Sequence, residues 1–402
     1  MNTPLAGVLA RYIRANGPLS VSEYMHLCLL HPRYGYYGRA TPVLGRQGDF
    51  VTAPEMTQAF GELLGIWLYV QWRDRLGAPS RVRLMELGPG RGTMMRQMLR
   101  AANKFPEFYR ALEVRLIEVS RTLRTQQQAA LEQPVREGRV RWLDSWDTEW
   151  LDQSAPVMLV AHEFLDALPV RHFVRQTPTR WLERLVDLDP QAPADQPRFR
   201  FVASRAPTPA AAMLPVSGIV DERDLPHLPD AIEVPVGAAT CVQRIAQWLQ
   251  ASGGVALLVD YAKRAQPPLA CTLRAVRQHR FEHVLHAPGE ADLTADVDFA
   301  LLERCVRAAV PDTPLHSMPQ GEFLQRMGLA ERMRVLAAAN PQQTAALQAA
   351  YARLVSPTAM GSVYRVAALS SPAKGAAGKR LPLLPFEPPA EPPAEPPAAR
   401  ST

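Results

Sequence analysis

A chain of 402 residues, 47% of them hydrophobic and 21% charged, is long enough to bury a substantial core as one large domain or as two. Its net charge is +6 and almost all of its basic residues are arginine, but no stretch concentrates basic residues on one face with interleaved aromatics, which argues against a nucleic-acid-binding protein. Four scattered cysteines without a Cys-x-x-Cys pair argue against a metal site or a disulfide framework. No apolar run reaches the roughly 20 residues of a transmembrane helix, and no signal-peptide core is present. These features predict a cytoplasmic soluble protein and leave its oligomeric state open.

The sequence pattern of residues 1–79 predicts an N-terminal helical cap followed by a loop. Apolar residues at helical spacing predict two helices over residues 5–30, with Ser20 able to cap the second of them. Residues 31–55 mix aromatic, glycine and charged residues without any period, and long ordered loops of this kind are usually functional. A further helix follows, and it ends at the Gly-Ala-Pro of residues 77–79.

From residue 80 onward strands and helices alternate, which predicts an α/β domain with a parallel sheet covered by helices on both faces. We expect strands at 81–87, 114–119, 140–143, 157–161, 255–260 and 362–369. Residues 171–236 break the rhythm and predict an inserted antiparallel β segment within this 80–369 domain. Helices are expected at about 297–309, 319–328 and 341–355. The repeat EPPAEPPAEPP in residues 370–402 predicts an extended, disordered tail.

The first strand runs into a glycine turn, and the spacing of that turn is informative. A helix opens directly behind it, so unpaired N–H groups and a positive dipole end face any bound ligand. The dinucleotide fingerprint requires G-x-G-x-x-G, whereas this chain has Glu86-x-Gly88-x-Gly90-x-Gly92, with the third glycine one residue early. The observed form resembles the first motif of class I methyltransferases that depend on S-adenosyl-L-methionine (SAM). A plain tight turn is the alternative.

Two acids at the next strand ends suit an adenosine ligand. Glu118 ends the second strand, and its carboxylate can accept hydrogen bonds from both ribose hydroxyls, although a solvated strand-end acid would also fit. Asp144 follows the third strand, at the point where such folds contact the adenine amino group, and an ordinary helix cap explains it equally well.

The segment HEFLD closes the fourth strand, where ligands of doubly wound sheets collect. It carries His162, Glu163 and Asp166, which makes it the leading catalytic candidate. The alternative is the first turn of a helix with favourably placed acids.

Seven blocks, from GPLSVSEYM near the N-terminus to PGEADLTADVDF, occur in an order that resembles the MidA family. Mitochondrial members of that family are complex I assembly factors that methylate arginine. The blocks between these two are HPRYGYY, GDFVTAPEMTQAFGELLG, ELGPGRGTMM, HEFLDALPV and LLVDY, so that the resemblance extends over about residues 5–369.

The resemblance implies a Rossmann-like class I fold with a seven-stranded, mostly parallel sheet, SAM as cofactor and a protein substrate such as a complex I subunit. By motif, the three glycines form the SAM turn, Glu118 binds the ribose, and Asp49, Thr52 and Glu55 lie over the cofactor or the substrate. One departure is Ala262, where the family pattern suggests glycine after LLVDY.

For arginine methylation, carboxylates that bind the guanidinium bidentately would aim one nitrogen at the methyl group. We expect Glu163 to be the first such clamp and Asp166 the second, with Asp49, Asp296 and Asp298 as substrate or loop anchors. The alternatives are a small-molecule methyltransferase, a non-catalytic assembly chaperone that keeps the fold and, least favoured, a nicotinamide oxidoreductase. The sequence leaves open the target protein and the methylation state of the product.

Overall fold

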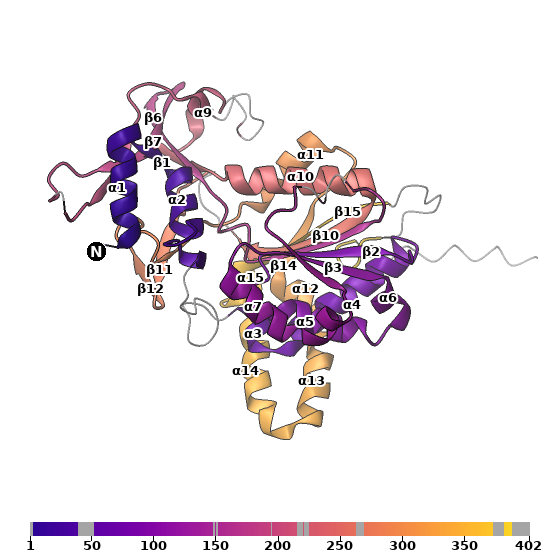
Figure 1. Cartoon of the computed structure of the whole chain (residues 1–402). Helices are drawn as coiled ribbons and strands as arrows, with labels where there is room; N and C mark the ends of the chain where they lie inside the picture. The colour runs from indigo at the N-terminus through magenta and orange to yellow at the C-terminus, as the bar shows by residue number, and fades with distance from the viewer. Residues whose placement is uncertain are drawn as a thin grey trace, which may run out of the picture.

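The structure, a computed structural model, describes a chain that folds into two lobes (Figure 1). The described residues are 3–38, 52–147, 149, 152–193, 195–214, 220, 225–262, 269–372 and 382–387. No helix among them has the length and apolar composition needed to cross a bilayer.

The larger lobe is organised around a seven-stranded mixed sheet with the strand order β14-β15-β10-β5-β2-β3-β4. Neighbouring strands are parallel from β10 to β4, whereas β15 runs antiparallel to both β10 and β14. Every residue of β2 and β5 is buried, as expected where helices cover both faces. The strands are β2 Val82–Leu87, β3 Leu112–Ile117, β4 Val140–Leu143, β5 Val157–His162, β10 Gly254–Tyr261, β14 His316–Pro319 and β15 Tyr364–Ser371.

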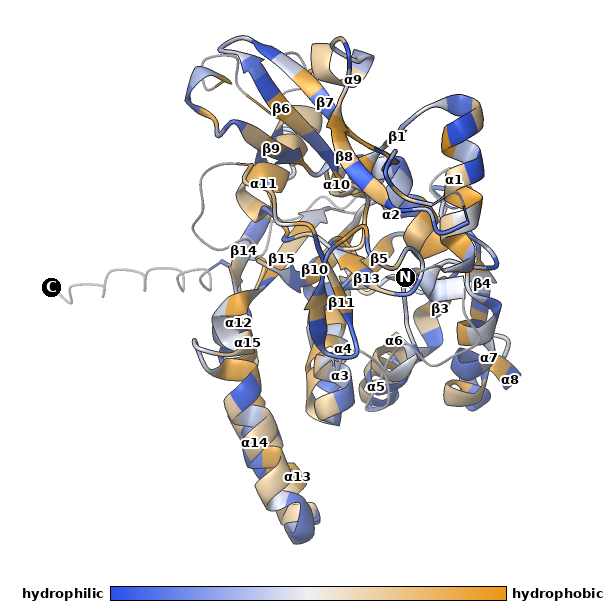
Figure 2. Cartoon of the chain, turned by 90° about the vertical axis from the view of Figure 1, so that its left-hand side faces the viewer, coloured by the Kyte–Doolittle hydropathy of each residue, from blue (hydrophilic) through white to orange (hydrophobic). Residues whose placement is uncertain are grey.

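Two helical layers cover the two faces of this sheet, and alternate residues of each strand point into different cores. Met158 and Val160 of β5 join the core under α4 and α5, whereas Leu159 and Ala161 join the core under α10 and α11. The first layer contains α3 Ala53–Met56, α4 Gln58–Asp74, α5 Thr93–Ala102, α6 Pro106–Ala111, α12 Gln320–Arg326, α13 Leu329–Ala339, α14 Thr344–Val355 and α15 Met360–Val363. The second contains α10 Val236–Ser252 and α11 Phe299–Ala309, and α7 Arg121–Ala130 and α8 Glu132–Arg136 lie between β3 and β4 in the chain. The α13–α14 pair extends away from the body as a helical arm (Figure 2).

The smaller lobe joins the two N-terminal helices to the predicted insertion. Its five-stranded sheet pairs antiparallel, which confirms the antiparallel character expected for residues 171–236. A three-stranded antiparallel sheet, which the sequence did not predict, completes the lobe. The elements are α1 Pro4–Asn16, β1 Leu19–Ser20, α2 Val21–Leu30, β6 Arg171–Thr177, β7 Arg180–Leu188, β8 Phe199–Ala203, α9 Pro209–Ala212, β9 Ala231–Val234, β11 Arg274–Arg277, β12 Arg280–Glu282 and β13 Asp292–Thr294.

The N-terminal helices belong to this smaller lobe because their apolar faces pack on it. Leu5 of α1 and Met25 of α2 share one core with Val186 of β7 and Leu293 of β13. Ser20 caps α2 as predicted, in a capping box with Glu23. In contrast, α4 packs against α5 in the larger lobe, so residue 79 does not separate two packing units.

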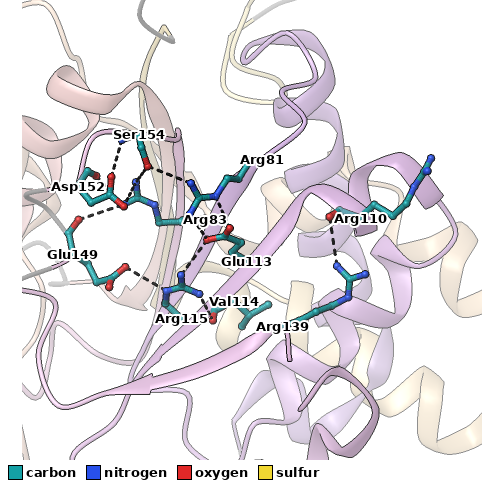
Figure 3. Close-up of polar contacts among 10 residues, drawn as sticks. All are labelled: Arg81, Arg83, Arg110, Glu113, Val114, Arg115, Arg139, Glu149, Asp152 and Ser154. Atoms are coloured by element: carbon teal, nitrogen blue, oxygen red, sulfur yellow. Dashed lines mark hydrogen bonds and ion pairs between the residues drawn. The ribbon is translucent and has the colours of Figure 1, made fainter. Parts of the chain in front are cut away.

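Two buried arginines, one on β2 and one on β3, hold the connection between β4 and β5 (Figure 3). Arg83 is 1% exposed and donates to the carbonyl oxygens of Glu149, at 3.2 Å, and Asp152, at 2.7 Å. Arg115 forms ion pairs with Glu113, at 3.0 Å, and with Glu149, at 3.3 Å. Because a buried guanidinium needs this many partners, the two arginines fix the course of a connection whose other end borders the functional site.

Residues 382–387 lie against the larger lobe, which differs from the disordered tail that composition predicted beyond residue 370. Leu383 is 1% exposed and joins the core of α4 and α12. The indole nitrogen of Trp67 donates to the carbonyl oxygen of Leu384 at 2.8 Å, and Arg326 donates to that of Pro385, also at 2.8 Å. The apolar residues of the sequence PLLPF, residues 382–386, therefore anchor this segment to the larger lobe.

We expect Leu383→Ala to destabilise the protein by about 2 kcal/mol, because it removes a fully buried leucine side chain from the core. Leu384→Ala is the matched control, since its side chain is 36% exposed and should cost much less. Urea unfolding midpoints of the two variants provide the measurement. Equal midpoints would show that residues 382–387 contribute no packing energy.

Candidate functional site

A cavity of about 1060 Å³ opens at the carboxyl ends of β2, β3, β5 and β10. Ligands of parallel α/β sheets bind at this edge. Most of the site residues predicted from the sequence line the cavity, namely Glu86, Gly88, Gly90, Glu118, Asp144, Glu163 and Asp166, together with Thr52, Glu55, His162 and Asp296. The fold therefore brings together residues that are more than 200 positions apart in the chain.

Three glycines of the turn after β2 adopt conformations that favour glycine. Gly88, Gly90 and Gly92 have φ angles of 61°, 53° and 77°, all in the left-handed region. A Cβ atom on Gly88 would lie 2.9 Å from the Phe164 ring. Gly92 does not line the cavity; it precedes α5, and a Cβ there would lie 3.3 Å from the Cα of Gln127. The turn thus lies close against two neighbouring segments.

Glu86 lies at the end of β2, beside this turn. Its side chain lines the cavity, is 2% exposed, and has an Oε2 atom without a hydrogen-bond partner among the described residues. Burial raises its pKa to about 8. A buried acceptor that faces a cavity needs a hydrogen-bond donor from a ligand. A ligand ammonium group would supply that donor, and its positive charge would stabilise the ionised form of Glu86.

Glu118 lies at the end of β3 and is held by two donors. Its Oε1 accepts from the backbone N–H of Ser120 at 2.7 Å, and its Oε2 accepts from Gln127 at 3.1 Å. Burial raises the pKa of Glu118, and these hydrogen bonds oppose the shift. Each carboxylate oxygen can accept a second hydrogen bond, so both remain available to a pair of ligand hydroxyls.

Gln127 connects the parts of this half of the site, and sequence reasoning missed it. The same amide nitrogen that binds Glu118 also donates to the carbonyl oxygen of Gly90 at 2.7 Å. Its amide oxygen accepts from the indole of Trp142 at 2.8 Å, and the residue is fully buried. A glutamine on the inner face of α7, in line with Leu123, was the available signal.

Asp144 lies at the rim of the cavity, with 85% of its side chain exposed. It forms an ion pair of 2.6 Å with Arg124, which also donates to the carbonyl oxygen of Glu118. Arg124 therefore joins the carboxyl ends of β3 and β4.

At the other half of the cavity, Glu163 follows β5 in a strained conformation. Its φ is 50°, which costs a residue with a side chain on the order of 1–3 kcal/mol. The hydroxyl of Tyr364 donates to its Oε1 at 2.8 Å. Burial raises the pKa of Glu163 to about 8, with further contributions from Asp260 and Asp292. The strain and the hydrogen bond together set the direction of this carboxylate.

Asp260, at the end of β10, holds the turn that carries Glu163 and Asp166. Its Oδ2 accepts from the backbone N–H groups of Phe164, Leu165 and Asp166 at 3.1, 2.8 and 3.3 Å. This role was not predicted, because it depends on two strands about 95 residues apart being neighbours in the sheet.

Buried acids collect around this turn. Asp166 is 4% exposed and Asp292 is 6% exposed, and both line the cavity. Burial raises the pKa of Asp166 well above its ordinary value, and Asp260 and Asp292 raise it further. Asp292 accepts a hydrogen bond from Tyr37 at 3.2 Å, and sequence reasoning had not singled it out. Such a cluster suits a cationic ligand, which would stabilise the ionised carboxylates.

His162 lies between the two halves and is neutral. Burial lowers its pKa to about 3, and its ring meets Phe60 edge-on with 5.2 Å between centroids. It is therefore not placed to donate a proton near neutral pH.

The remaining predicted residues have varied surroundings. Glu55 lines the cavity and accepts from Thr93 at 2.8 Å, and Asp296 forms an ion pair with Arg274. Asp298 is not among the residues that line the cavity; it caps α11 by accepting from the backbone N–H of Leu301 at 3.0 Å, which fits the role of a loop anchor. Asp49 lies outside the described residues.

Ala262 directly follows β10 and lines the cavity. Its backbone N–H donates to the carbonyl oxygen of Val363 at 2.7 Å, and it bridges to Val297. Alanine stands here in place of the predicted glycine. Because the φ angle of Ala262 is not positive, the backbone at this position does not require glycine.

The acidic side chains around the glycine turn favour some classes of ligand over others. A buried carboxylate at Glu86 opposes a pyrophosphate on the turn and favours an ammonium group, while Glu118 presents two acceptors to a ribose. SAM carries an ammonium group and a ribose and lacks a pyrophosphate. The fold and the site together define a SAM-dependent methyltransferase.

Comparison with known proteins identifies the group within this class. Residues 63–314 match the sequence profile of a family described as "Putative S-adenosyl-L-methionine-dependent methyltransferase". The chain is 35% identical over 387 residues to "Protein arginine methyltransferase NDUFAF7, mitochondrial" of Rattus norvegicus, covering 91% of this chain and 84% of the relative. It is also 35% identical over 384 residues to the Drosophila melanogaster homolog, covering 90% of this chain and 85% of the relative.

A solved structure is also similar over nearly the whole chain. A Burkholderia thailandensis protein bound to S-adenosyl-homocysteine is 27% identical, with a TM-score of 0.73, and the match covers 92% of this chain and 93% of that chain. The chain belongs to this family of SAM-dependent methyltransferases, the MidA family that its motifs predicted.

We expect Gln127→Leu to weaken SAM binding by about ten-fold while the protein stays folded. Leucine keeps the buried volume but removes the donor to Glu118 and Gly90, so the carboxylate loses its orientation. Isothermal titration calorimetry with SAM measures the effect. Gln128→Leu on the exposed face of the same helix is the control, and equal affinities for the two variants would contradict a positioning role.

Proposed function

We propose that this chain is a class I SAM-dependent methyltransferase that methylates an arginine side chain of a protein. The observation that carries the proposal is an acidic cluster that lines the same cavity as the glycine turn, in which Asp166 and Asp292 are buried and the Glu163 side chain is 15% exposed. An arginine guanidinium stays protonated at neutral pH and presents several N–H donors, so it complements such a cluster in charge and in hydrogen bonding.

The cofactor half of the site would hold SAM through three groups. The glycine turn at Gly88 admits the ligand close to the backbone, Glu86 binds the ammonium group, and Glu118 accepts from the ribose. When bound, SAM supplies an electrophilic methyl group. Because the transfer is an in-line displacement, the remaining task of the protein is to position and polarise the acceptor nitrogen.

Glu163 and Asp166 provide that positioning. Glu163 is aimed by its bond to Tyr364, and Asp166 is fixed through the backbone bonds to Asp260. Two carboxylates that bind one guanidinium through its N–H groups restrict its rotation and oppose delocalisation of the attacking lone pair. A carboxylate with a raised pKa can also take the proton that the methylated nitrogen loses.

Two observations favour a protein substrate with catalysis over the alternatives. Leu30 and Phe281 line the cavity and are 40% and 78% exposed, so the cavity has an open apolar rim rather than the sealed pocket expected for a small molecule. The unpaired buried carboxylate of Glu86 favours retained SAM binding over a non-catalytic chaperone. The names of the curated relatives include protein arginine methyltransferase, which supports a protein substrate, and a respiratory complex I subunit as the target stays a prediction. The cytoplasmic location stays a prediction.

Mass spectrometry of a strain that lacks this chain tests the proposal. Protein extract from the strain is incubated with the purified protein and SAM, and arginine-containing peptides are compared with and without the enzyme. We expect one or a few arginines to gain methyl groups. Methyl transfer that appears only in the small-molecule fraction would contradict the proposal and favour the second enzyme class.

A further inference from the structure

The hairpin of β11 and β12 has an unusual turn. Arg277 pairs with Arg280, so Gln278 and His279 form a two-residue loop, and their φ angles are 49° and 59°. Such loops place both central residues in the left-handed region, where asparagine and glycine are preferred. Two residues with longer side chains hold the turn here, and His279 lines the cavity.

The two faces of this hairpin have different surroundings. Val276 pairs with Phe281, so their side chains lie on one face, and both line the cavity together with Arg274. Ala275 lies on the opposite face, is 1% exposed, and joins the core formed with α1 and α2. The hairpin is therefore anchored from behind by α1 and α2, and Phe281 lies at the cavity on the opposite face.

Phe281 is unusually exposed for an aromatic residue. It is 78% exposed, more than any other large hydrophobic side chain among the described residues. Leu30, at the end of α2, also lines the cavity and is 40% exposed. Large exposed apolar side chains that line a functional cavity mark a binding surface, since water is a poor partner for them.

The lining of the cavity is therefore acidic at its floor and apolar at its exposed rim. Asp166 and Asp292 at the floor are buried acids and Glu163 beside them is only 15% exposed, whereas Leu30 and Phe281 at the rim are exposed and apolar. An arginine side chain that reaches the buried acids leaves its own backbone, and the residues beside it, at the rim.

We propose that Phe281 and Leu30 form a specificity surface that holds an apolar side chain next to the target arginine in the protein substrate. This inference rests on the proposed function and adds to it a substrate class, a segment with an apolar residue flanking the methylated arginine. The surface contributes binding energy remote from the reacting nitrogen. Loss of the surface should therefore raise KM for the protein and leave SAM binding unchanged.

The test measures initial rates of methyl transfer from tritiated SAM to arginine in protein extract from a strain that lacks this chain, at increasing extract concentration. We expect Phe281→Ser to raise the apparent KM about ten-fold with an unchanged maximal rate. Phe281→Leu should restore most of the wild-type KM, because it replaces the lost apolar surface. Val335→Ser is the matched control, since Val335 is 41% exposed on α13 and does not line the cavity.

Isothermal titration calorimetry with SAM accompanies the kinetics and shows that each variant is folded and binds the cofactor. Rates for Phe281→Ser that match the wild type at every extract concentration would overturn the inference and leave the proposed function intact. A lower SAM affinity or a lower maximal rate at unchanged KM would also overturn it. Absence of methylarginine with the wild-type enzyme would refute the proposed function and this inference with it.

Discussion

Glutamine in place of Glu163 is expected to lower kcat for methyl transfer to arginine by about 10²–10³-fold, with SAM affinity close to that of the wild type. The amide has nearly the same shape as the carboxylate, but it presents donors to a guanidinium that itself offers only donors. The loss should appear in kcat because the clamp acts on the orientation of the attacking nitrogen. Single-turnover rates with tritiated SAM, together with calorimetric SAM titrations, provide the measurement.

Two further variants distinguish the carboxylates that bind the guanidinium from the residue that orients Glu163. Tyr364→Phe removes the hydrogen bond to Glu163 Oε1 and keeps the charge, so its effect should be much smaller. Asp166→Asn tests the second clamp. Methylation by Glu163→Gln at a near wild-type rate would show that Glu163 is not the clamp.

Because the pKa of Glu163 is raised, the pH dependence of kcat/KM provides a second test of the Glu163→Gln variant. Burial raises the pKa to about 8, so below that pH the free site holds a neutral carboxyl group and above it a carboxylate. A cationic guanidinium binds the carboxylate form, so kcat/KM should rise from pH 6.5 to pH 9 and then level off. In Glu163→Gln, the part of the rise in kcat/KM that comes from ionisation of Glu163 should disappear. Ionisation of Asp166, whose pKa is also raised, should leave a weaker pH dependence of kcat/KM. A profile unchanged by the substitution would assign the rise to another group.

Valine in place of Gly88 is expected to abolish SAM binding in a protein that still folds. Gly88 has a φ of 61°, which a β-branched residue resists, and a Cβ atom would lie 2.9 Å from the Phe164 ring. The added methyl groups would also enter the space beside the turn that SAM needs. Calorimetry with SAM and a thermal unfolding curve of the same sample make the measurement.

Gly138→Val is the matched control for backbone strain. Gly138 has a similar φ of 69°, and no atom lies within 4 Å of the position of its Cβ. Both variants should lose stability, but only Gly88→Val should lose SAM binding. Unchanged SAM affinity in folded Gly88→Val would exclude this turn from the cofactor site.

Features that depend on local pattern were predicted well from the sequence. The mainly apolar segments of β2, β5 and β10 are buried strands, as expected, because a strand covered on both faces needs an apolar side chain at most positions. The capping residue Ser20 also has its predicted role. The glycine turn follows β2 as predicted, and its conformation accounts for the glycines.

Features that depend on long-range packing were missed. Strand β14 has only four residues and pairs with β15, so it carries too little pattern of its own to identify. The β11–β13 sheet is similarly short, and it is stable only because α1 and α2 cover one face of it. The docking of residues 382–387 depends on hydrogen bonds from Trp67 and Arg326, which no local pattern reveals.

The sequence by itself determined the order of strands and helices, the glycine turn and the class of ligand, because these depend on the spacing of nearby residues and on the chemistry of individual side chains. Only the tertiary structure decided which acids face one another. Asp260 supports the turn of Glu163 and Asp166, and Gln127 ties Gly90 to Glu118, through contacts between segments that only the folded sheet makes neighbours. Burial, which raises the pKa of Glu163, is likewise a property of the assembled cavity rather than of the residue.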